Sequence, residues 1–136
     1  MIDIHNQVYT RLHDGLSDVC VVESEYTVTP SEYPCVTVDE SSNRDVTWTF
    51  DSSEKKKFAR VVYTIQIFSN KEGGRKQEAR KIFGMVGDLM WDMGFSQTAF
   101  ATRPQVYNSS SYCIAAQYTA IVREDGAIFR NATKGS

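Results

Sequence analysis

The sequence contains no long hydrophobic run, and this absence argues against a membrane-spanning helix. Among its 136 residues, no stretch of about 18 apolar residues occurs. The N-terminal segment is amphipathic and carries acidic residues early, which fits neither a secretory signal nor a transit peptide. We therefore expect no membrane association and a chain that folds in the cytoplasm of the cell that makes it.

Histidine and cysteine are too few and too scattered for a typical metal site. The two histidines, His5 and His13, lie eight residues apart, and none of the three cysteines (Cys20, Cys35 and Cys113) belongs to a C-x-x-C pair. We expect buried thiols in a reducing compartment and no bound metal. A disulfide between Cys20 and Cys35 stays open as an alternative, because both can lie on neighbouring strands.

Catalytic motifs are also missing from the sequence. It has no G-x-S-x-G, P-loop, H-E-x-x-H or G-x-G-x-x-G pattern. The segment Gly73–Lys76 precedes a predicted helix, whose free N–H groups could hold an anion. It lacks the spacing of a P-loop, however, and is better explained as a flexible connection between a strand and a helix. The sequence therefore predicts no catalytic residue, no cofactor and no enzyme activity.

Hydrophobic periodicity predicts two helices. The segment Met1–Leu16 repeats apolar residues every four positions, and a continuous apolar stripe with a period of 3.6 residues runs from Arg75 to Met93. Gly94 follows this stripe and suits the left-handed position at which many helices end. Phe95 is available for the apolar contact that accompanies such an end.

Period-two alternation and β-branched residues predict strands between and after these helices. We expect the polar segment Glu40–Arg44 to be a turn and Asp51–Lys57 to be a charged loop. Residues 1–131 are then a single compact α+β domain, with a mainly antiparallel sheet and two helices packed on one face, and residues 132–136 are a disordered tail. The predicted strands are Val19–Val28, Cys35–Asp39, Asp45–Phe50, Phe58–Phe68, Thr98–Thr102, Ser111–Arg123 and Ala127–Arg130.

The net charge of −2 hides an asymmetry between the two parts of the chain. Residues 1–54 carry eleven acidic residues against two arginines, a balance of −9, whereas residues 55–136 carry thirteen basic against six acidic residues, a balance of +7. If folding separates these charges, one side of a subunit can attract the opposite side of another copy. If folding interleaves them, the surface is close to neutral. The mildly acidic chain disfavours nonspecific binding to nucleic acid.

The two longest predicted strands each have a second face that is neither fully polar nor fully apolar. Opposite the expected core, one strand presents Val62 and Phe68 and the other presents Ala115 and Ile121, among threonine, glutamine and arginine residues. Such a mixture suits a protein–protein interface. A loop that covers this face is an equally good explanation.

The order of these segments resembles a known family. An N-terminal amphipathic helix is followed by EYTVTPSEYPCVTVDE, then by VVYTIQIFSNKEGGRKQEAR, a helix ending in WDMGF, and SSYCIAAQYTAIVREDGAIFR. Over nearly the whole chain, this pattern is similar to the small tail terminator (tail completion) proteins of long-tailed bacteriophages. The most specific parts are the strand-to-helix passage, the Gly-Phe pair after the helix and the C-terminal strand with its turn.

The resemblance implies a structural virion protein without an active site. Such subunits form a hexameric ring that caps the head-proximal end of the tail tube, stops its polymerisation and joins the tail to the head connector or stopper protein. DNA passes through the lumen of the ring without specific binding. The resemblance thus places the protein in the neck of the virion tail, after assembly in the host cytoplasm.

We expect the contacts of such a ring on charged loops and on the second sheet face. One alternative is another neck or tail adaptor of the same virion. Another is a small ligand-binding α+β module with a helix-to-sheet cleft lined by aromatic residues such as Tyr63, Tyr112, Tyr118 and Trp91. The candidate interface residues are Arg44, Trp48, Phe50, Lys55, Lys56, Lys57, Val62, Phe68, Lys71, Arg75, Lys76 and Ile121.

Overall fold

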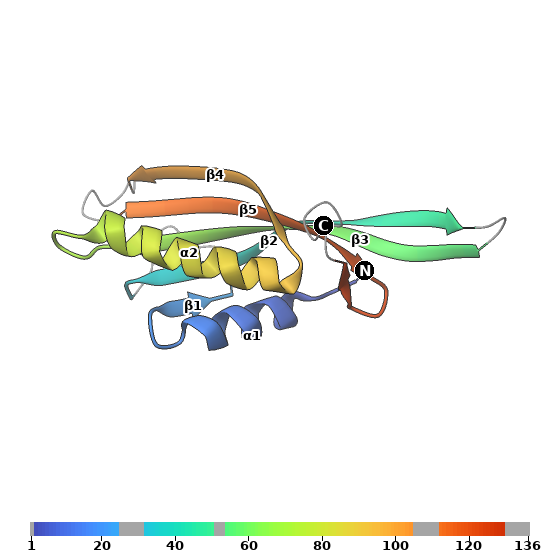
Figure 1. Cartoon of the computed structure of the whole chain (residues 1–136), viewed down its shortest axis with the longest axis horizontal. Coiled ribbons are helices and arrows are strands. Elements are labelled where there is room, and N and C mark those ends of the chain that lie inside the picture. Colours follow the sequence, from blue (N-terminus) through green and yellow to red (C-terminus); the bar gives the residue numbers. More distant parts are fainter. Residues whose placement is uncertain (1, 25–31, 51–53, 105–111, 130–136) are drawn as a thin grey trace.

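The protein forms two layers, a β-sheet and a pair of helices that cover one of its faces (Figure 1). The computed structural model describes residues 2–24, 32–50, 54–104 and 112–129. The predicted α+β class, with a mainly antiparallel sheet and both helices on one face, is confirmed. In chain order the elements are α1 (His5–Leu16), β1 (Val21–Glu23), β2 (Cys35–Phe50), β3 (Glu54–Ser69), α2 (Arg75–Met93), β4 (Ser96–Pro104), β5 (Tyr112–Arg123) and β6 (Ile128–Phe129).

The sheet has the strand order β1-β2-β3-β5-β4, and β6 adds a short pair to β5. Only the pairing of β1 with β2 is parallel. Strand β3 lies at the centre, with β2 on one side and β5 on the other. This position explains why its sequence has the clearest alternation, since alternate residues from Ala59 to Ile67 are buried in the core.

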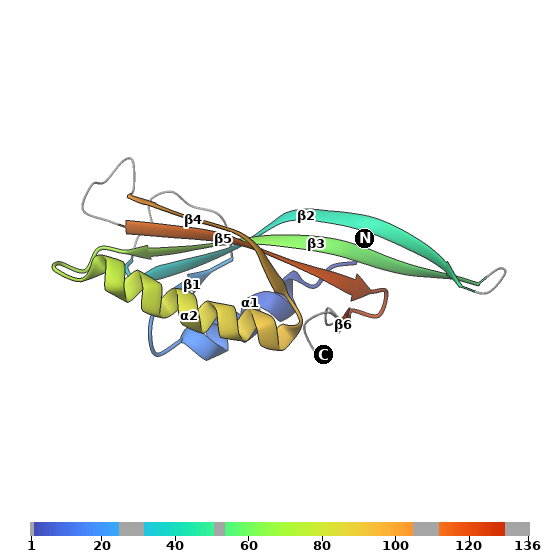
Figure 2. The ribbon, with the colours of Figure 1, turned by 45° about the horizontal axis from the view of Figure 1, so that its top comes forward.

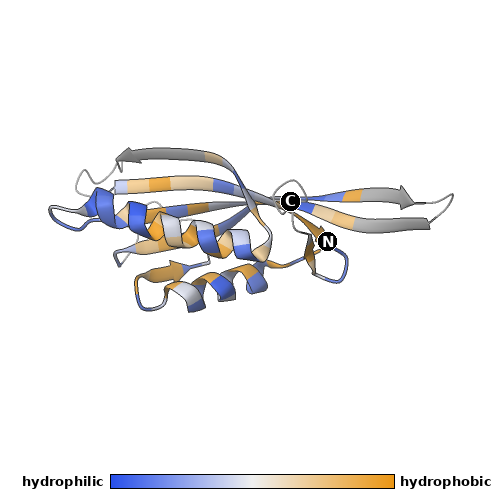
Figure 3. Ribbon diagram, viewed as in Figure 1, coloured by the Kyte–Doolittle hydropathy of each residue, from blue (hydrophilic) through white to orange (hydrophobic). Residues whose placement is uncertain are grey.

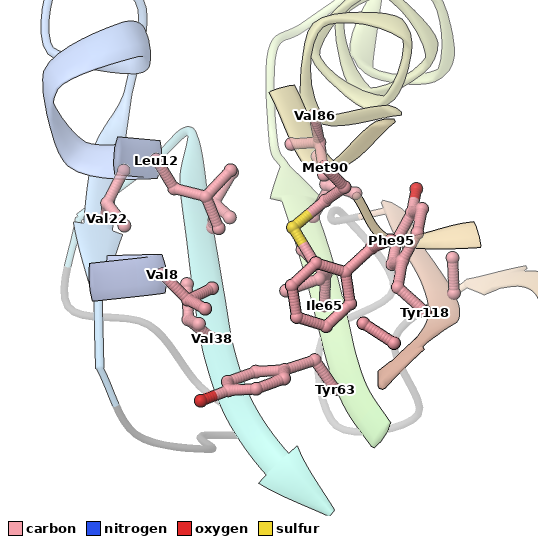
Figure 4. Close-up of a cluster of buried hydrophobic side chains, with 14 of the residues drawn as sticks. Val8, Leu12, Val22, Val38, Tyr63, Ile65, Val86, Met90, Phe95 and Tyr118 are labelled. Carbon is pink, nitrogen blue, oxygen red and sulfur yellow. The ribbon is translucent and has the colours of Figure 1, made fainter. Parts of the chain in front are cut away.

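The core lies between the helices and the sheet (Figure 4). The apolar faces of α1 and α2 pack on the alternate residues of β2, β3 and β5 that point toward them. The ring of Tyr63 meets that of Phe95 edge-on, with centroids 5.7 Å apart. The predicted stripe of α2 is buried at Ala79, Ile82, Val86 and Met90.

Both helices end where local chemistry favours it. The Asp3 carboxylate accepts a hydrogen bond from the His5 N–H at 3.0 Å, and α1 begins at His5 rather than at Met1. At the end of α2, Gly94 has φ of 106°, its N–H bonds to the Trp91 carbonyl, and the Phe95 N–H bonds to the Met90 carbonyl. This is the predicted left-handed glycine end, and Phe95 is buried beside it.

The structure corrects the predicted break in β2. The segment Glu40–Arg44 is not a turn, because one strand runs from Cys35 to Phe50 with a register shift between Glu40 and Ser42. In the described part of the chain no strand pairs with that edge of β2; Ser41, Ser42 and Arg44 are exposed there, whereas Glu40 and Asn43 are half-buried. Polarity here marks an exposed strand with a bulge rather than a chain reversal.

Other element boundaries also differ from the prediction. The predicted charged loop Asp51–Lys57 is wrong for Glu54–Lys57, which begin β3. Strand β1 spans only Val21–Glu23, and the rest of the predicted strand up to Val28 falls largely on residues outside those described. The predicted disordered tail, residues 132–136, also lies outside them.

Candidate interaction surfaces

The sheet face that the helices do not cover is accessible in its central part. We call this central part the open face, and its residues are given at the end of this paragraph. They alternate with core residues on β3 and β5, and the register places Val62 opposite Thr119 and Thr64 opposite Gln117. Gln117 is exposed and the others are half-buried. The open face consists of Val62, Thr64, Ala115, Gln117, Thr119 and Ile121.

Hydroxyl groups line this open face and bond to one another. The Ser41 and Thr64 hydroxyl oxygens lie 2.7 Å apart, and those of Thr98 and Thr119 lie 3.2 Å apart. These contacts lie among the apolar side chains of Val62, Ala115 and Ile121. A face that mixes polar and apolar groups in this way suits contact with another protein surface.

One end of the same sheet face is closed instead. Cys35, Phe68 and Cys113 form a small second core against which Tyr33 packs, and Phe68 is 1% exposed. Phe68 was predicted as an interface residue, but in the subunit its ring is a packing residue and is inaccessible to a partner. The covering-loop alternative is therefore correct for this end, and the interface hypothesis survives for the open face.

A buried hydrogen bond belongs to this closed end. The Thr37 hydroxyl donates to the Gln66 side-chain oxygen at 3.0 Å, and both residues are buried. Burial raises the pKa of the Cys35 thiol to about 12, with a smaller effect from the charge of Glu23. Such a thiol stays protonated at neutral pH and is a poor nucleophile. No disulfide joins Cys20 to Cys35.

The paired strands β2 and β3 extend beyond the rest of the sheet as an arm (Figure 2). Strand β5 ends at Arg123, opposite Phe58, so residues 47–50 and 54–57 pair only with each other. The register sets Trp48 opposite Lys56 and Phe50 opposite Glu54. This arm carries five of the candidate interface residues away from the body of the subunit.

Two edges of the sheet lack a partner strand among the described residues. Strand β4 ends the strand order, and β1 pairs with β2 only at Cys35–Thr37. Farther along β2, the N-terminal segment approaches instead, where the Asn43 side-chain amide donates to the Ile2 carbonyl at 2.7 Å. These two edges are unlike each other in length and sequence, so they can serve two different contacts.

The outer surface of the helix layer is strongly charged. The N-terminal end of α2 is hydrophilic in Figure 3, and Lys71, Lys76, Arg80 and Lys81 are exposed there while Arg75 is half-buried. The connection before it turns at Gly73, which has φ of 76°, and the hollow over Gly73–Gln77 is shallow and open. Its shape fits the expected flexible connection better than a built anion site.

A polar cluster between the start of α1, the bulge of β2 and the middle of β3 was not predicted. His5 stacks on the Tyr63 ring and its Nδ1 lies 3.2 Å from the Tyr63 hydroxyl, which in turn lies 3.4 Å from a Glu40 carboxylate oxygen. His5 Nε2 lies 3.2 Å from the Ser24 carbonyl oxygen. Because a carbonyl only accepts, Nε2 is the donor in that contact, and the Tyr63 hydroxyl donates its single proton to Glu40.

This cluster anchors chain segments rather than performing chemistry. Burial, and after it the charge of Glu40, raise the pKa of Tyr63 far above its usual range, so the phenol stays neutral. A neutral phenol held between two partners is neither a base nor a nucleophile. The cluster instead ties the start of α1 to the bulge of β2. The members are far apart in the sequence, and no local pattern signals their contact.

Side chains fill the space between α2 and the sheet in which a small-molecule site was considered. Tyr63 and Tyr118 are both buried in the core, and together with Phe95 and Met90 they fill the space between the layers (Figure 4). Trp91 lies outside that space, on the outer side of α2, with 37% of its surface exposed. The aromatic residues that suggested a ligand are packing residues or surface residues.

Neither a metal-binding cluster nor a membrane-spanning helix occurs in the described part of the chain. Those residues contain no group of three or more histidine, cysteine or acidic side chains placed to hold a metal ion. No helix among them is both long and apolar enough to cross a bilayer.

Comparison with known proteins finds a structural relative but no sequence relative. No protein-family model matches the sequence, and no curated protein matches it. Among solved structures, a chain from the virion of the native gene transfer agent (GTA) particle has a similar fold, with a TM-score of 0.59. The match covers 88% of this chain and 94% of that chain at 12% sequence identity. At this identity the likeness establishes a shared fold over almost the full length of both chains.

Proposed function

We propose that the protein is a structural component of a phage-type virion, and within it a tail terminator. In this role, copies of the chain form a ring, with six as the expected number, that caps the head-proximal end of the tail tube and stops its growth. The observation that carries the proposal is the fold shared with a virion chain over 88% of this chain. The strand-to-helix and C-terminal sequence passages described above agree with the finer assignment.

The surfaces of the subunit support assembly into a ring. A closed ring of identical copies needs two different, complementary surfaces on each copy. The described residues provide unlike sheet edges on β2 and β4, a projecting arm and the open face. Arg44, Val62 and Ile121 belong to these surfaces and remain candidate contacts, as do Lys71, Arg75 and Lys76 on the helix layer.

We also propose that the protein has no catalytic activity. In the described residues, Tyr63 is held neutral between two partners, and burial raises the pKa of the Cys20 thiol to about 11. The proposed partners are further copies of the chain, the major tail tube protein and the head connector or stopper protein. DNA is expected only to pass through the lumen, and the proposed location is the neck of the virion.

Imaging tests the ring directly. The purified protein, alone and mixed with assembled tail tubes, is examined by negative-stain microscopy and native mass spectrometry. We expect closed rings of about six copies that bind one end of the tubes. Rings that form but ignore tube ends would indicate a different neck or tail adaptor. A strict monomer in both conditions would contradict the structural role itself.

A matched pair of variants separates folding from assembly in this experiment. Ile121→Arg places a charge on the open face, where the native side chain is half-buried, whereas Glu124→Arg places one on the exposed turn that follows β5. We expect the first variant to stay folded and lose the rings and the second to keep them. If both variants form rings with the native yield, the open face is not a contact.

A further inference from the structure

Basic charge gathers at one end of the helix layer. We define the basic end as the four exposed residues Lys71, Lys76, Arg80 and Lys81, and none of them is in an ion pair within the described residues. Two acidic residues lie nearby: Glu72 is exposed in the connection before α2, and the Glu78 carboxylate accepts a hydrogen bond from the Ser69 hydroxyl at 2.6 Å. Cations near a helix N-terminus oppose the helix dipole. The isolated subunit therefore gains no stability from this arrangement.

Acidic charge gathers where the two helices meet. A Cβ atom on Gly15 of α1 would lie 2.7 Å from a Leu89 methyl carbon of α2, so the helices touch at this point. Exposed acidic residues flank the contact on both helices, and we call them the acidic patch. Two described ion pairs lie at this junction, the loose contact of Asp14 with its neighbour His13 at 3.5 Å and that of Arg11 with Asp92 at 3.9 Å, and neither includes Asp18 or Asp88. The patch consists of Asp14, Asp18 and Asp88.

The two charged regions are too far apart to neutralise each other. On α2 the nearest members of the two regions, Lys81 and Asp88, are seven positions apart, which at 1.5 Å per residue is about 10 Å and beyond ion-pair distance, and Lys76 and Asp88 are about 18 Å apart. The Debye length at physiological ionic strength is about 8 Å, so exposed charges at these separations are largely screened from one another. Each region can therefore attract an external partner of opposite sign.

We propose that the basic end of one copy packs against the acidic patch of the next copy in the ring. This inference rests on the proposed function, because it assigns a contact within the proposed ring. The two regions are different surfaces on one subunit, as a head-to-tail contact requires. The contact relieves the unfavourable cations at the start of α2, and it gives the ring a direction, since only one order of subunits pairs opposite charges.

A second copy explains these charges better than nucleic acid does. A nucleic acid that followed the helix layer from the basic end would reach the acidic patch within about 18 Å, roughly ten phosphate charges along a duplex. The chain as a whole is also mildly acidic, with a net charge of −2. A neighbouring subunit, in contrast, presents acidic and basic regions at the same spacing.

Two charge-reversal variants and their mixture test the proposal. The first variant carries Lys76→Glu, Arg80→Glu and Lys81→Glu, and the second carries Asp14→Lys, Asp18→Lys and Asp88→Lys. Each variant alone would place like charges in every contact between copies. We therefore expect the protein concentration at which half of the chains are in rings to be at least about tenfold higher than for the native chain. In an equimolar mixture, alternating copies restore opposite charges at every contact, so rings containing both variants return.

Controls distinguish this contact from other effects. Thermal melting checks that each variant folds, and the first variant is expected to melt no lower than the native chain because it improves the helix dipole. A Lys76→Arg, Lys81→Arg variant keeps the charge and should assemble normally.

Several outcomes would overturn the proposal. Native-like assembly of either reversed variant at physiological salt removes the contact but leaves the ring intact. A mixture that stays unassembled also contradicts the pairing of these two regions. If the first variant assembles but loses binding to duplex DNA in a mobility-shift assay, the basic end is a nucleic-acid surface. If the native chain forms no ring, alone or with tubes, the proposed function fails together with this contact.

Discussion

Removing the hydroxyl oxygen should destabilise the protein at one buried tyrosine, Tyr63, and should not do so at another, Tyr118. The Tyr63 hydroxyl lies within hydrogen-bond distance of His5 and Glu40, whereas the Tyr118 hydroxyl is buried without a hydrogen-bond partner among the described residues. Tyr63→Phe and Tyr118→Phe delete the same atom from the same core. The pair therefore isolates the hydrogen bonds from the packing of the ring.

The magnitudes follow from these partners. Tyr63→Phe removes a hydrogen bond with a charged group and should lower the free energy of unfolding by about 1.5–3 kcal/mol. Tyr118→Phe removes a buried, unpaired hydroxyl, whose desolvation costs about 1–3 kcal/mol, and should leave stability unchanged or raise it. Burial raises the pKa of Tyr118 to about 12, so no ionised form complicates the comparison at neutral pH.

Urea denaturation of both variants and the native chain, at pH 7 and equal protein concentration, measures the difference. For a chain of this length, the loss in Tyr63→Phe corresponds to a fall in Tm of several degrees. Equal stabilities of Tyr63→Phe and the native chain, or a larger loss in Tyr118→Phe, would refute the reasoning. A His5→Ala variant should lose stability as well and should add little to Tyr63→Phe, because the two residues share one network.

Three further predictions concern the core, the end of α2 and the arm. Val86→Ala should lower the free energy of unfolding, measured by urea denaturation, by about 2–4 kcal/mol, because it opens a cavity in the core. At urea concentrations below its unfolding midpoint, this variant should still form rings. Gly94→Ala should lower the free energy of unfolding by about 1–2 kcal/mol, because φ of 106° is strained for alanine. Gly84→Ala, at an exposed position within α2, serves as its control. Reversing Lys55–Lys57 to glutamate should raise the protein concentration needed for ring assembly without lowering Tm; normal assembly at physiological salt would remove the arm from the interface.

The sequence predicted the elements whose two faces differ most. Helix α2, its glycine end and strands β3 and β5 were identified because burial of one face imposes a regular period on their residues. The β2 half of the arm was predicted as part of the strand Asp45–Phe50, but its other half, Glu54–Lys57, and the bulge of β2 were missed, because burial of one face imposes no such period there. Residues 54–57 lie in a two-stranded ribbon outside the core, and Glu40–Arg44 lie on an uncovered strand, so neither segment carries an apolar alternation.

The interaction surfaces could be predicted only in part. The mixed character of the open face was visible in Val62 and Ile121, but the burial of Phe68 depends on Tyr33 and Cys35, which come from other elements. The His5–Tyr63 contact joins residues 58 positions apart. The separation of charge into a basic end and an acidic patch likewise depends on how α1 packs across α2, which no single segment determines.

The measurement that tests the central proposal most directly is the length of tail tubes grown in the presence of this protein. Tube protein is polymerised with increasing amounts of the native chain, and lengths and ends are counted by electron microscopy. The proposal predicts rings at one end of each tube, no further growth from that end, and shorter tubes at higher ratios. Tubes of unchanged length with bare ends, at a concentration where the protein forms rings, would contradict it.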